Sequence, residues 1–248
     1  MDLELKEFLL FKSDYYENPN FIEHDPIQIP KRFTQKEDIE IVAFLVATIA
    51  WGNRQSIIKS AEKLIRIMGN SPYDFIMNYE PSNEFSFVHR TFNSQDLNYF
   101  FTALKHCYLT GGLEAQFMCN TQQGIKHRII SFRSNFLSLP HDPRASKHVS
   151  NPESGSAAKR LVMFLRWMVR PNTKGVDFGI WQNISPSELY VPLDVHTGNI
   201  ARKIGILNRK QNDWTSNEEL KEVLIKIDPI DPARFDFALF GLGAFEKF

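Results

Sequence analysis

The amino-acid sequence predicts an all-α protein, and three observations support this fold class. Apolar residues recur at spacings of three and four along most of the chain, which is typical of helices. The segment Glu40–Trp51 is apolar on nearly every side, which indicates a helix buried at the centre of the protein. No alternating strand pattern and no Asn-Gly hairpin is found in the sequence.

The first two predicted helices follow one another closely. Glu40–Trp51 ends at the breaker Gly52-Asn53, and Arg54–Met68 then resumes the helical spacing until Gly69-Asn70 supplies a C-terminal stop. We therefore expect two helices joined by a tight turn. Further helices are predicted at Gln95–Tyr108, Thr121–Leu137, Ala157–Arg170, Val195–Ile204, Ser216–Ile227 and Pro232–Phe240.

Other segments predict irregular structure. Leu139–Gly155 is polar and carries three prolines, and Asn172–Pro192 is interrupted by glycine and proline. Asp14–Arg32 is also polar and proline-containing, and we interpret it as an extended lead-in that wraps the first large helix. The C-terminal segment Phe235–Phe245 is so densely apolar that it predicts a buried helix ending at Gly241 or Gly243.

Length and hydropathy limit the class of protein. A chain of 248 residues forms one large or two small domains, and we expect a single helical unit with possible lobes at 36–138 and at 1–35 plus 139–248. The longest apolar run, Ile41–Trp51, falls short of the roughly 20 residues that a bilayer requires. The acidic, amphipathic N-terminus does not resemble a secretory signal. We expect a cytoplasmic protein with no membrane segment.

Two cysteines bound the metal chemistry. Cys107 and Cys119 form no CxxC pair and have no neighbouring Cys or His pair at ligand spacing. An iron–sulfur cluster and a four-thiolate zinc site are therefore excluded. We interpret both residues as ordinary buried thiols and expect neither a metal nor a cofactor.

Charge is unevenly distributed. The 29 Lys and Arg residues balance 29 Asp and Glu residues, which at first argues against a nucleic-acid partner. Residues 126–210, however, carry 14 basic and 5 acidic residues, a local net charge of +9 that leaves −9 for the remainder. Basic surfaces attract polyanions by counterion release, although proteins without such a partner also show asymmetries of this size. The distribution predicts a basic face and an acidic back.

Asp194 lies at a helix start. The apolar approach of Val191–Gly205 ends at Asp194, and a helix of roughly ten residues begins directly after it, which is the position of an N-cap. One interpretation is purely structural, because a carboxylate there accepts hydrogen bonds from free amides and complements the helix dipole. The functional interpretation adds that a fixed, ionised carboxylate can stabilise a developing cation or act as a base.

Lys159 lies near the start of a second helix of interest, Ala157–Arg170. A polar turn containing Gly155 leads into it, so its first amides are free to meet a phosphate. Lys159, Met163, Arg166 and Arg170 fall at i, i+4, i+7 and i+11 and share one face. This face is either a solvated basic stripe, or it holds a desolvated lysine beside Arg160 with the lowered pKa that an amine nucleophile requires.

Three stretches resemble, in order, the helix-hairpin-helix DNA glycosylase superfamily, which includes endonuclease III and the 8-oxoguanine glycosylases. They are 40–69, 155–170 and 191–207. Gly155-Ser-Ala-Ala-Lys159 is similar to the hairpin that opens the catalytic helix of that family, and Leu193-Asp194-Val-His196 is similar to its downstream aspartate segment. The resemblance implies a two-lobed helical bundle with its site in the cleft between the lobes.

Some features differ from the general family pattern. Ala157 replaces the second hairpin glycine, and Lys159 and Asp194 lie 35 residues apart, a spacing similar to that of the archaeal 8-oxoguanine glycosylase branch. Asn172–Tyr190 would be an insertion between the two elements. A closer resemblance, to the uncharacterised bacterial family DUF2400, rests on Lys159–Arg170, Pro192–Thr197 and Asp228–Leu239.

The glycosylase resemblance implies a function. The expected activity is base-excision repair of an oxidised purine such as 8-oxoguanine, with β-lyase activity, in a nucleoid-associated monomer whose partner is duplex DNA containing a damaged base. Lys159 would attack C1′ and Asp194 would act as its base or electrostatic partner. The implied DNA-binding residues are Gly155, Ser156, Ala157, Arg160, Arg166, Arg170, His196, Trp51 and Asn53, and the implied base-pocket residues are Met163 and Phe245.

Alternatives remain for several of these assignments. His196 either turns toward a phosphate or packs on its neighbours, and Trp181 and Trp214 either stack on a base or belong to the core. For the whole protein, the alternatives are a non-catalytic nucleic-acid-binding module that retains the fold and a structural helical protein. Only the glycosylase requires both Lys159 and Asp194.

Overall fold

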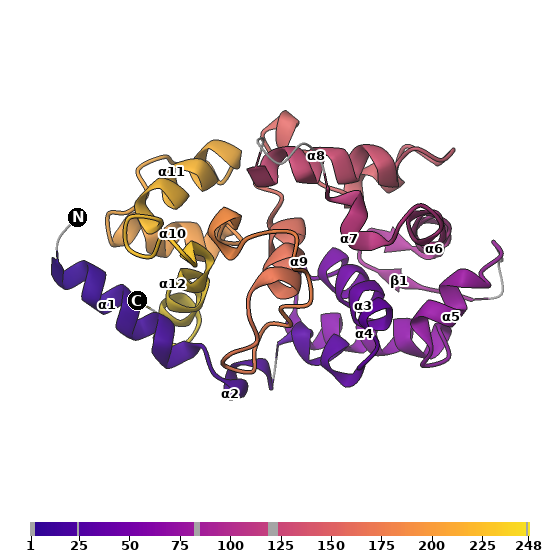
Figure 1. Cartoon of the computed structure of the whole chain (residues 1–248), viewed down its shortest axis with the longest axis horizontal. Helices are drawn as coiled ribbons and strands as arrows, with labels where there is room; N and C mark the ends of the chain where they lie inside the picture. The colour runs from indigo at the N-terminus through magenta and orange to yellow at the C-terminus, as the bar shows by residue number, and fades with distance from the viewer. Residues whose placement is uncertain (1–2, 24, 82–84, 119–123, 247) are drawn as a thin grey trace. The chain divides into compact units, whose positions relative to one another are not determined.

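A computed structural model describes residues 3–23, 25–81, 85–118, 124–246 and 248 (Figure 1). Within these ranges the protein is all-α apart from one pair of two-residue strands. Cys119 and the first residues of the predicted helix Thr121–Leu137 lie outside the described residues. No helix of the described part has the length and apolar character needed to cross a membrane.

The chain divides into two compact units. Met1–Glu23 and Asn151–Phe248 form one, which we call the terminal unit, and His24–Ser150 form the other, the central unit. Residues 24–35 belong to the central unit because Ile27 and Ile29 are completely buried in turns that pack on its first helix. At its other end, the ring of His148 contacts Phe92 at 4.8 Å.

The central unit is built around one apolar helix, α3 (Lys36–Thr48), in which every residue from Ile39 to Thr48 is buried. Phe44 on α3 contacts three other phenylalanine rings at centroid distances of 5.2 to 5.9 Å, and these come from α6 (Ser94–Leu109) and α8 (Gly124–Phe136). The remaining elements are η1 (Pro26–Gln28), η2 (Pro30–Arg32), α4 (Arg54–Ile67), α5 (Pro72–Met77), β1 (Val88–His89), β2 (Phe92–Asn93), α7 (Leu113–Gln116) and η4 (Ala145–His148).

The predicted tight turn between α3 and α4 is present. Asn53 caps α4 by accepting a hydrogen bond from the amide of Ser56. Gly52 precedes it at φ +100°, and a Cβ there would lie 2.7 Å from Nη1 of Arg90. The glycine is therefore needed for the backbone angle, whereas the flexible end of the Arg90 side chain could move aside for a Cβ.

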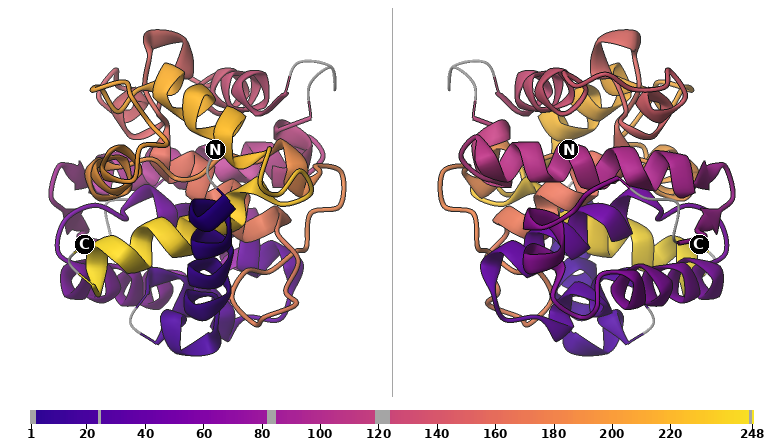
Figure 2. Two further views of the ribbon diagram at one scale, coloured as in Figure 1. Left: turned by 90° about the vertical axis from the view of Figure 1, so that its left-hand side faces the viewer. Right: turned by 90° about the vertical axis from the view of Figure 1, so that its right-hand side faces the viewer.

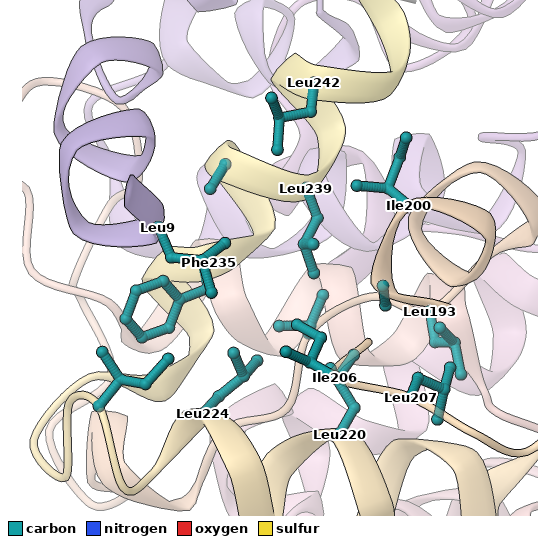
Figure 3. Packing of buried hydrophobic residues seen from close by; sticks show 14 of the residues in the cluster. Leu9, Leu193, Ile200, Ile206, Leu207, Leu220, Leu224, Phe235, Leu239 and Leu242 are labelled. Atoms are coloured by element: carbon teal, nitrogen blue, oxygen red, sulfur yellow. The ribbon is translucent and has the colours of Figure 1, made fainter. Parts of the chain in front are cut away.

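The terminal unit joins both ends of the chain. Helix α1 (Leu3–Tyr16) lies beside α12 (Phe235–Ala244) (Figure 2). Apolar side chains from α1, α10 (Val195–Lys203), α11 (Trp214–Leu224) and α12 form one core, shown in Figure 3. The other elements are α2 (Pro19–Ile22), η5 (Pro152–Ser154), α9 (Lys159–Val169), η6 (Pro186–Glu188) and η7 (Pro232–Arg234).

Three local predictions were wrong. The segment Asp14–Arg32 is not extended: α1 runs through Tyr16, and α2, η1 and η2 follow it. Two short strands, β1 and β2, pair where none was expected. Helix α12 does not end at Gly241 or Gly243 but continues to Ala244. A Cβ on Gly241 would lie 2.2 Å from the ring of Tyr16, so this glycine lets α1 approach and is not a helix stop.

Candidate active site

The turn before α9 is held by the start of α11. Gly155 has φ +83° and its carbonyl accepts a hydrogen bond from the amide of Trp214 at 3.0 Å. The carbonyl of Ala157 accepts a hydrogen bond from Nδ2 of Asn217 at 3.1 Å. Ser156 forms a bridge with Asp213, and its Oγ accepts from the amide of Ala158. The predicted hairpin is thus a fixed turn whose carbonyl groups face into the unit.

Helix α9 begins without a side-chain cap. Its N-cap residue is Ala158, in the left-handed region at φ +47°, and a methyl group cannot accept a hydrogen bond. The neighbouring helices α10 and α11 are capped by Asp194 and Asp213, each of which accepts from an amide of its first turn. Among these three helices, only α9 lacks an anionic cap for its positive end.

The structure brings the two predicted catalytic side chains together. Nζ of Lys159 lies 3.4 Å from Oδ2 of Asp194. Oδ1 of the same carboxylate accepts the amide of Thr197 at 3.0 Å, so Asp194 caps α10 and faces the amine at once. Both side chains are about one-third exposed, at 32% and 30%, so the pair can be reached from solvent. Oδ1 of Asp194 is therefore the helix cap of the structural interpretation, and Oδ2 is the oxygen that faces the amine, as the functional interpretation requires.

Other predicted residues of the terminal unit lie in varied environments. Met163, one turn after Lys159, is half-buried. Arg160 is also half-buried, and burial lowers the pKa of its guanidinium to about 10. His196 is exposed on the first turn of α10. Phe245 is 56% exposed and stacks on Tyr16 at a centroid distance of 5.7 Å.

Arg166 and Arg170 require a correction, because the sequence assigned them to DNA phosphates. Each is 3% exposed. Arg166 pairs with Asp177 and Asp236, and Arg170 pairs with Glu17, Asp177 and Asp231. Although burial alone would lower the pKa of Arg170, hydrogen bonds to Asp231 and the surrounding carboxylates raise it. A buried guanidinium engaged with carboxylates is not available to a phosphate, so both arginines have a structural role.

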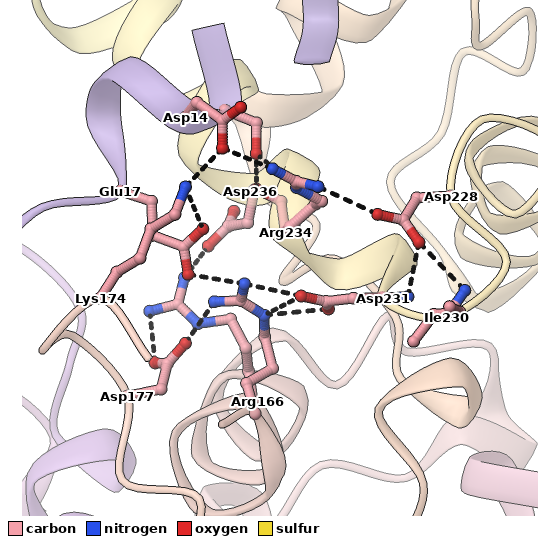
Figure 4. A network of polar contacts seen from close by, with 12 residues as sticks. Asp14, Glu17, Arg166, Lys174, Asp177, Asp228, Ile230, Asp231, Arg234 and Asp236 are labelled. Atoms are coloured by element: carbon pink, nitrogen blue, oxygen red, sulfur yellow. Dashed lines mark hydrogen bonds and ion pairs between the residues drawn. The ribbon is translucent and has the colours of Figure 1, made fainter. Parts of the chain in front are cut away.

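These arginines belong to a polar network that links α1, α9, α12 and the loop after α9 (Figure 4). Lys174 and Arg234 pair with Asp14, and Arg234 also pairs with Asp228. The network contains four cations and six carboxylates: Arg166, Arg170, Lys174 and Arg234 with Asp14, Glu17, Asp177, Asp228, Asp231 and Asp236.

Asp236 is a buried member of this network that sequence reasoning did not single out. It is 8% exposed, and burial raises the pKa of its carboxyl to about 6. The charges of Arg166 and Lys159 oppose that rise, and those of Asp194 and Asp177 reinforce it. The apolar helix around Asp236 gave no sign of this ion pairing, because the partners of Asp236 lie far away along the chain.

The remaining predicted DNA-binding residues, Trp51 and Asn53, lie in the central unit. The ring of Trp51 stacks on His148 at 6.1 Å and meets His89 edge-on at 5.2 Å, and Asn53 is exposed. His89 also bonds Ser60 and the carbonyl of Trp51. Trp181 and Trp214 are each 1% exposed, which confirms the interpretation that they belong to the core.

The described ranges contain many His, Cys, Asp and Glu side chains of the kinds that bind metal ions. Within them, no group of three or more His, Cys, Asp and Glu side chains is placed to hold a metal ion. Cys107 is a buried thiol, as predicted, and burial raises its pKa to about 12.

Fold and site define a two-unit, all-α protein with a solvent-accessible lysine–aspartate pair between two helix starts of its terminal unit. Residues 25–245 match the model of the family described as "Protein of unknown function (DUF2400)". The chain belongs to this family, which confirms the closer of the two resemblances. No curated protein and no solved structure matches the chain.

Proposed function

We propose that this protein is a DNA glycosylase of the helix-hairpin-helix type, with lyase activity, that removes an oxidised purine from duplex DNA. The observation that carries the proposal is the 3.4 Å approach of Lys159 Nζ to Asp194 Oδ2 at an accessible position. The two residues are 35 positions apart, and nothing in local structure requires them to meet. A glycosylase that acts through an amine requires both.

The chemistry follows from the pair. Transfer of a proton from the Lys159 ammonium to Asp194 yields a neutral amine, which is the nucleophilic form. Its nitrogen forms a bond to C1′ of the extruded nucleotide while the bond from C1′ to the base breaks, and the bonding electrons leave with the base. Opening of the sugar ring then gives an iminium ion. Loss of a proton from C2′ expels the 3′ phosphate and nicks the strand.

The uncapped start of α9 supports the same proposal. Because Ala158 offers no acceptor to the first-turn amides, that end of the helix keeps its positive potential for an outside anion. We propose that the first-turn amides of α9 bind a backbone phosphate there, which would place the sugar of a neighbouring nucleotide near Lys159. Met163, half-buried one turn later, is the proposed wall of the base pocket.

The test is covalent trapping. The protein is incubated with duplexes containing 8-oxoguanine, an abasic site or no lesion, and borohydride then reduces any iminium to a stable adduct that is seen on a gel. We expect an adduct with wild type on at least one lesion duplex and none with Lys159→Ala. Asp194→Asn should lower the trapping rate by about 10²-fold or more, as loss of a general base does. Lys210→Ala, which removes an exposed lysine elsewhere in the same unit, is the matched control.

Two results would contradict the proposal. Absence of an adduct with wild type across a panel of lesions removes the lyase activity, and an adduct that survives Lys159→Ala removes this lysine as the nucleophile. The alternative, a nucleic-acid-binding or structural protein in which the pair only joins α9 to α10, predicts no adduct and a small stability loss of about 0 to 1 kcal/mol for Lys159→Ala.

A further inference from the structure

Helix α4 of the central unit carries a row of cations on the side opposite its buried residues. Lys59, Lys63 and Arg66 follow one another at i, i+4 and i+7, so they share one face of the helix. With a rise of about 1.5 Å per residue, they extend over about 10 Å along its axis. The buried residues, which form the apolar face of the helix, are Ile57, Ala61, Leu64 and Ile65.

These three cations are not neutralised by the protein itself. Lys59 and Arg66 are exposed, and Lys63 is half-buried. Among the residues that the structure describes, none offers a hydrogen bond or an ion pair to the charged group of any of the three. The one acidic residue of α4, Glu62, is already paired with Arg32 at 2.6 Å. The face therefore keeps its positive charge for an outside partner, unlike the buried arginines of α9.

The hairpin β1–β2 holds a fourth cation at the N-terminal end of α4. His89 on β1 fastens the hairpin to the helix, because its Nδ1 shares a hydrogen bond of 2.9 Å with Oγ of Ser60. Arg90 is the next residue and is exposed at φ +54°, a backbone angle that costs a non-glycine residue about 1 to 2 kcal/mol. Its Nη1 lies 2.7 Å from the position of a Cβ on Gly52, in the turn before α4. No described carboxylate pairs with this guanidinium either.

We infer that these four cations bind the phosphate backbone of duplex DNA. We call them the α4 surface, and its members are Lys59, Lys63, Arg66 and Arg90. Charge complementarity selects the partner, because unpaired cations attract a polyanion and gain affinity by releasing its counterions. An anionic membrane fits less well, since a membrane-surface helix also inserts an apolar face, and the apolar face of α4 is buried. The choice of DNA rests on the proposed function, but the binding is measured without a lesion.

The size of the α4 surface sets the expected strength of binding. Four phosphate contacts contribute a slope of about −3 to −4 to the dependence of log affinity on log salt. Proteins with about 6 to 10 such contacts show a much steeper dependence. The affinity for undamaged duplex should therefore be modest and sensitive to salt. Phosphate contacts carry no sequence information, so the α4 surface would hold and orient the duplex without selecting its sequence.

The experiment measures binding to a duplex that has no lesion. Full-length protein is titrated into the fluorescein-labelled duplex at about 50 to 200 mM salt, and fluorescence anisotropy gives the affinity at each concentration. The triple variant Lys59→Gln, Lys63→Gln, Arg66→Gln should make the slope shallower by about 2 to 3, and Arg90→Gln by about 1. Substitutions at exposed positions should change stability by no more than about 0.5 kcal/mol each, which urea unfolding checks.

Two matched variants test whether the position and the charge of these residues matter. A triple variant that exchanges Lys59→Arg, Lys63→Arg and Arg66→Lys keeps all three charges and should keep the wild-type slope. A control that removes three charges from α1 and the other end of the chain should change the slope by less than about 1. Its substitutions are Lys6→Gln, Lys210→Gln and Lys226→Gln.

The outcomes separate the inference from the proposed function. Absence of binding by wild type at the lowest salt, or a slope that the α4 triple variant leaves unchanged or the control lowers equally, overturns the inference, while borohydride trapping can still succeed. A slope that depends on the α4 surface, with no trapping on any lesion, supports the surface and rejects the glycosylase. Binding to phosphatidylserine vesicles in preference to the duplex, abolished in the α4 triple variant, would assign the surface to a membrane and overturn its assignment to DNA.

Discussion

The corrected role of Arg170 gives a strong prediction about stability. Substituting Arg170→Met keeps most of the side-chain volume but removes a guanidinium that is 3% exposed and pairs with Glu17, Asp177 and Asp231 at 2.6 to 2.7 Å. Breaking a buried pair by deleting one partner costs about 3 to 5 kcal/mol, because the remaining charge is left uncompensated. The structure therefore predicts a large loss from a change that leaves the proposed catalytic residues intact.

The expected magnitude lies at the lower end of that range. Asp177 keeps Arg166 at 3.3 Å and Glu17 keeps Lys174 at 3.6 Å, so two of the three carboxylates retain a cation, and Asp231 is 20% exposed to water. We expect a loss of about 3 kcal/mol in the free energy of unfolding. With a urea dependence of about 1 to 3 kcal/mol per molar, the unfolding midpoint should fall by about 1 to 3 M.

Tryptophan fluorescence during urea unfolding is a suitable assay. Trp167, Trp181 and Trp214 are three of the four tryptophans, and all three are buried in the terminal unit, so the signal reports mainly on the unit that contains Arg170. Lys210→Met, at an exposed lysine of the same unit, is the control and should change stability by no more than about 0.5 kcal/mol.

A second measurement distinguishes the structural role from phosphate binding. If Arg170 held a DNA phosphate, Arg170→Met would lower the slope of log affinity against log salt by about one and leave stability nearly unchanged. A loss below about 1 kcal/mol together with such a change of slope would refute the burial argument. The reverse result, a large stability loss with an unchanged slope wherever the variant is folded, is the one expected.

Three further predictions concern stability and reactivity. Gly241→Ala should destabilise the terminal unit several-fold more than Gly155→Ala does. A Cβ at Gly241 would lie 2.2 Å from the ring of Tyr16, whereas a Cβ at Gly155 would meet open space and cost only the strain of a φ of +83°, about 1 kcal/mol. Urea unfolding of both variants measures the difference. Burial holds the pKa of Asp236 at about 6, above its ordinary 3.8, so between these two pH values the folded protein binds a proton that the unfolded chain does not bind. The stability that this proton contributes is therefore lost as pH rises from about 4 to about 6. The fall in unfolding midpoint between pH 5 and pH 7 should be smaller in Asp236→Asn than in wild type. Burial also raises the pKa of Cys107 to about 12, so in a Cys119→Ser variant a thiol reagent should react at pH 8 only after denaturant is added.

The sequence predicted the features that depend on short segments. Asp194 was identified as an N-cap because an apolar approach and a helical pattern meet at that residue, and the structure shows its Oδ1 accepting the amide of Thr197. The helix beginning at Lys159 was predicted from the turn at Gly155 and the periodic residues after it. Each catalytic candidate was thus placed locally, and the resemblance to a known family suggested that the two would meet.

What the sequence could not show is which charges meet across long separations. Arg170 lies 153 positions from Glu17 and 61 from Asp231, and Arg166 lies 70 positions from Asp236. No periodicity connects residues that far apart. The spacing i, i+4, i+7, i+11 put the cations on one face of a helix, but Arg166 and Arg170 on that face are covered by carboxylates from α12 and three loops. The face therefore does not form a basic surface stripe.

The same pairing changes the meaning of the basic segment 126–210. At least eight of its 14 cations contact carboxylates, carbonyl groups or amide side chains of the protein itself: Arg128, Arg144, Lys159, Arg166, Arg170, Lys174, Arg202 and Arg209. A local charge of +9 therefore overstates the charge that a polyanion would meet, since charge attracts DNA only where it is not already neutralised. For the proposed glycosylase, less of the binding free energy would come from the formal charge of this segment and more from neutral groups such as the first-turn amides of α9. An enzyme built this way would bind undamaged duplex weakly and depend on the lesion itself for affinity, because an already weakened base pair lowers the cost of extrusion.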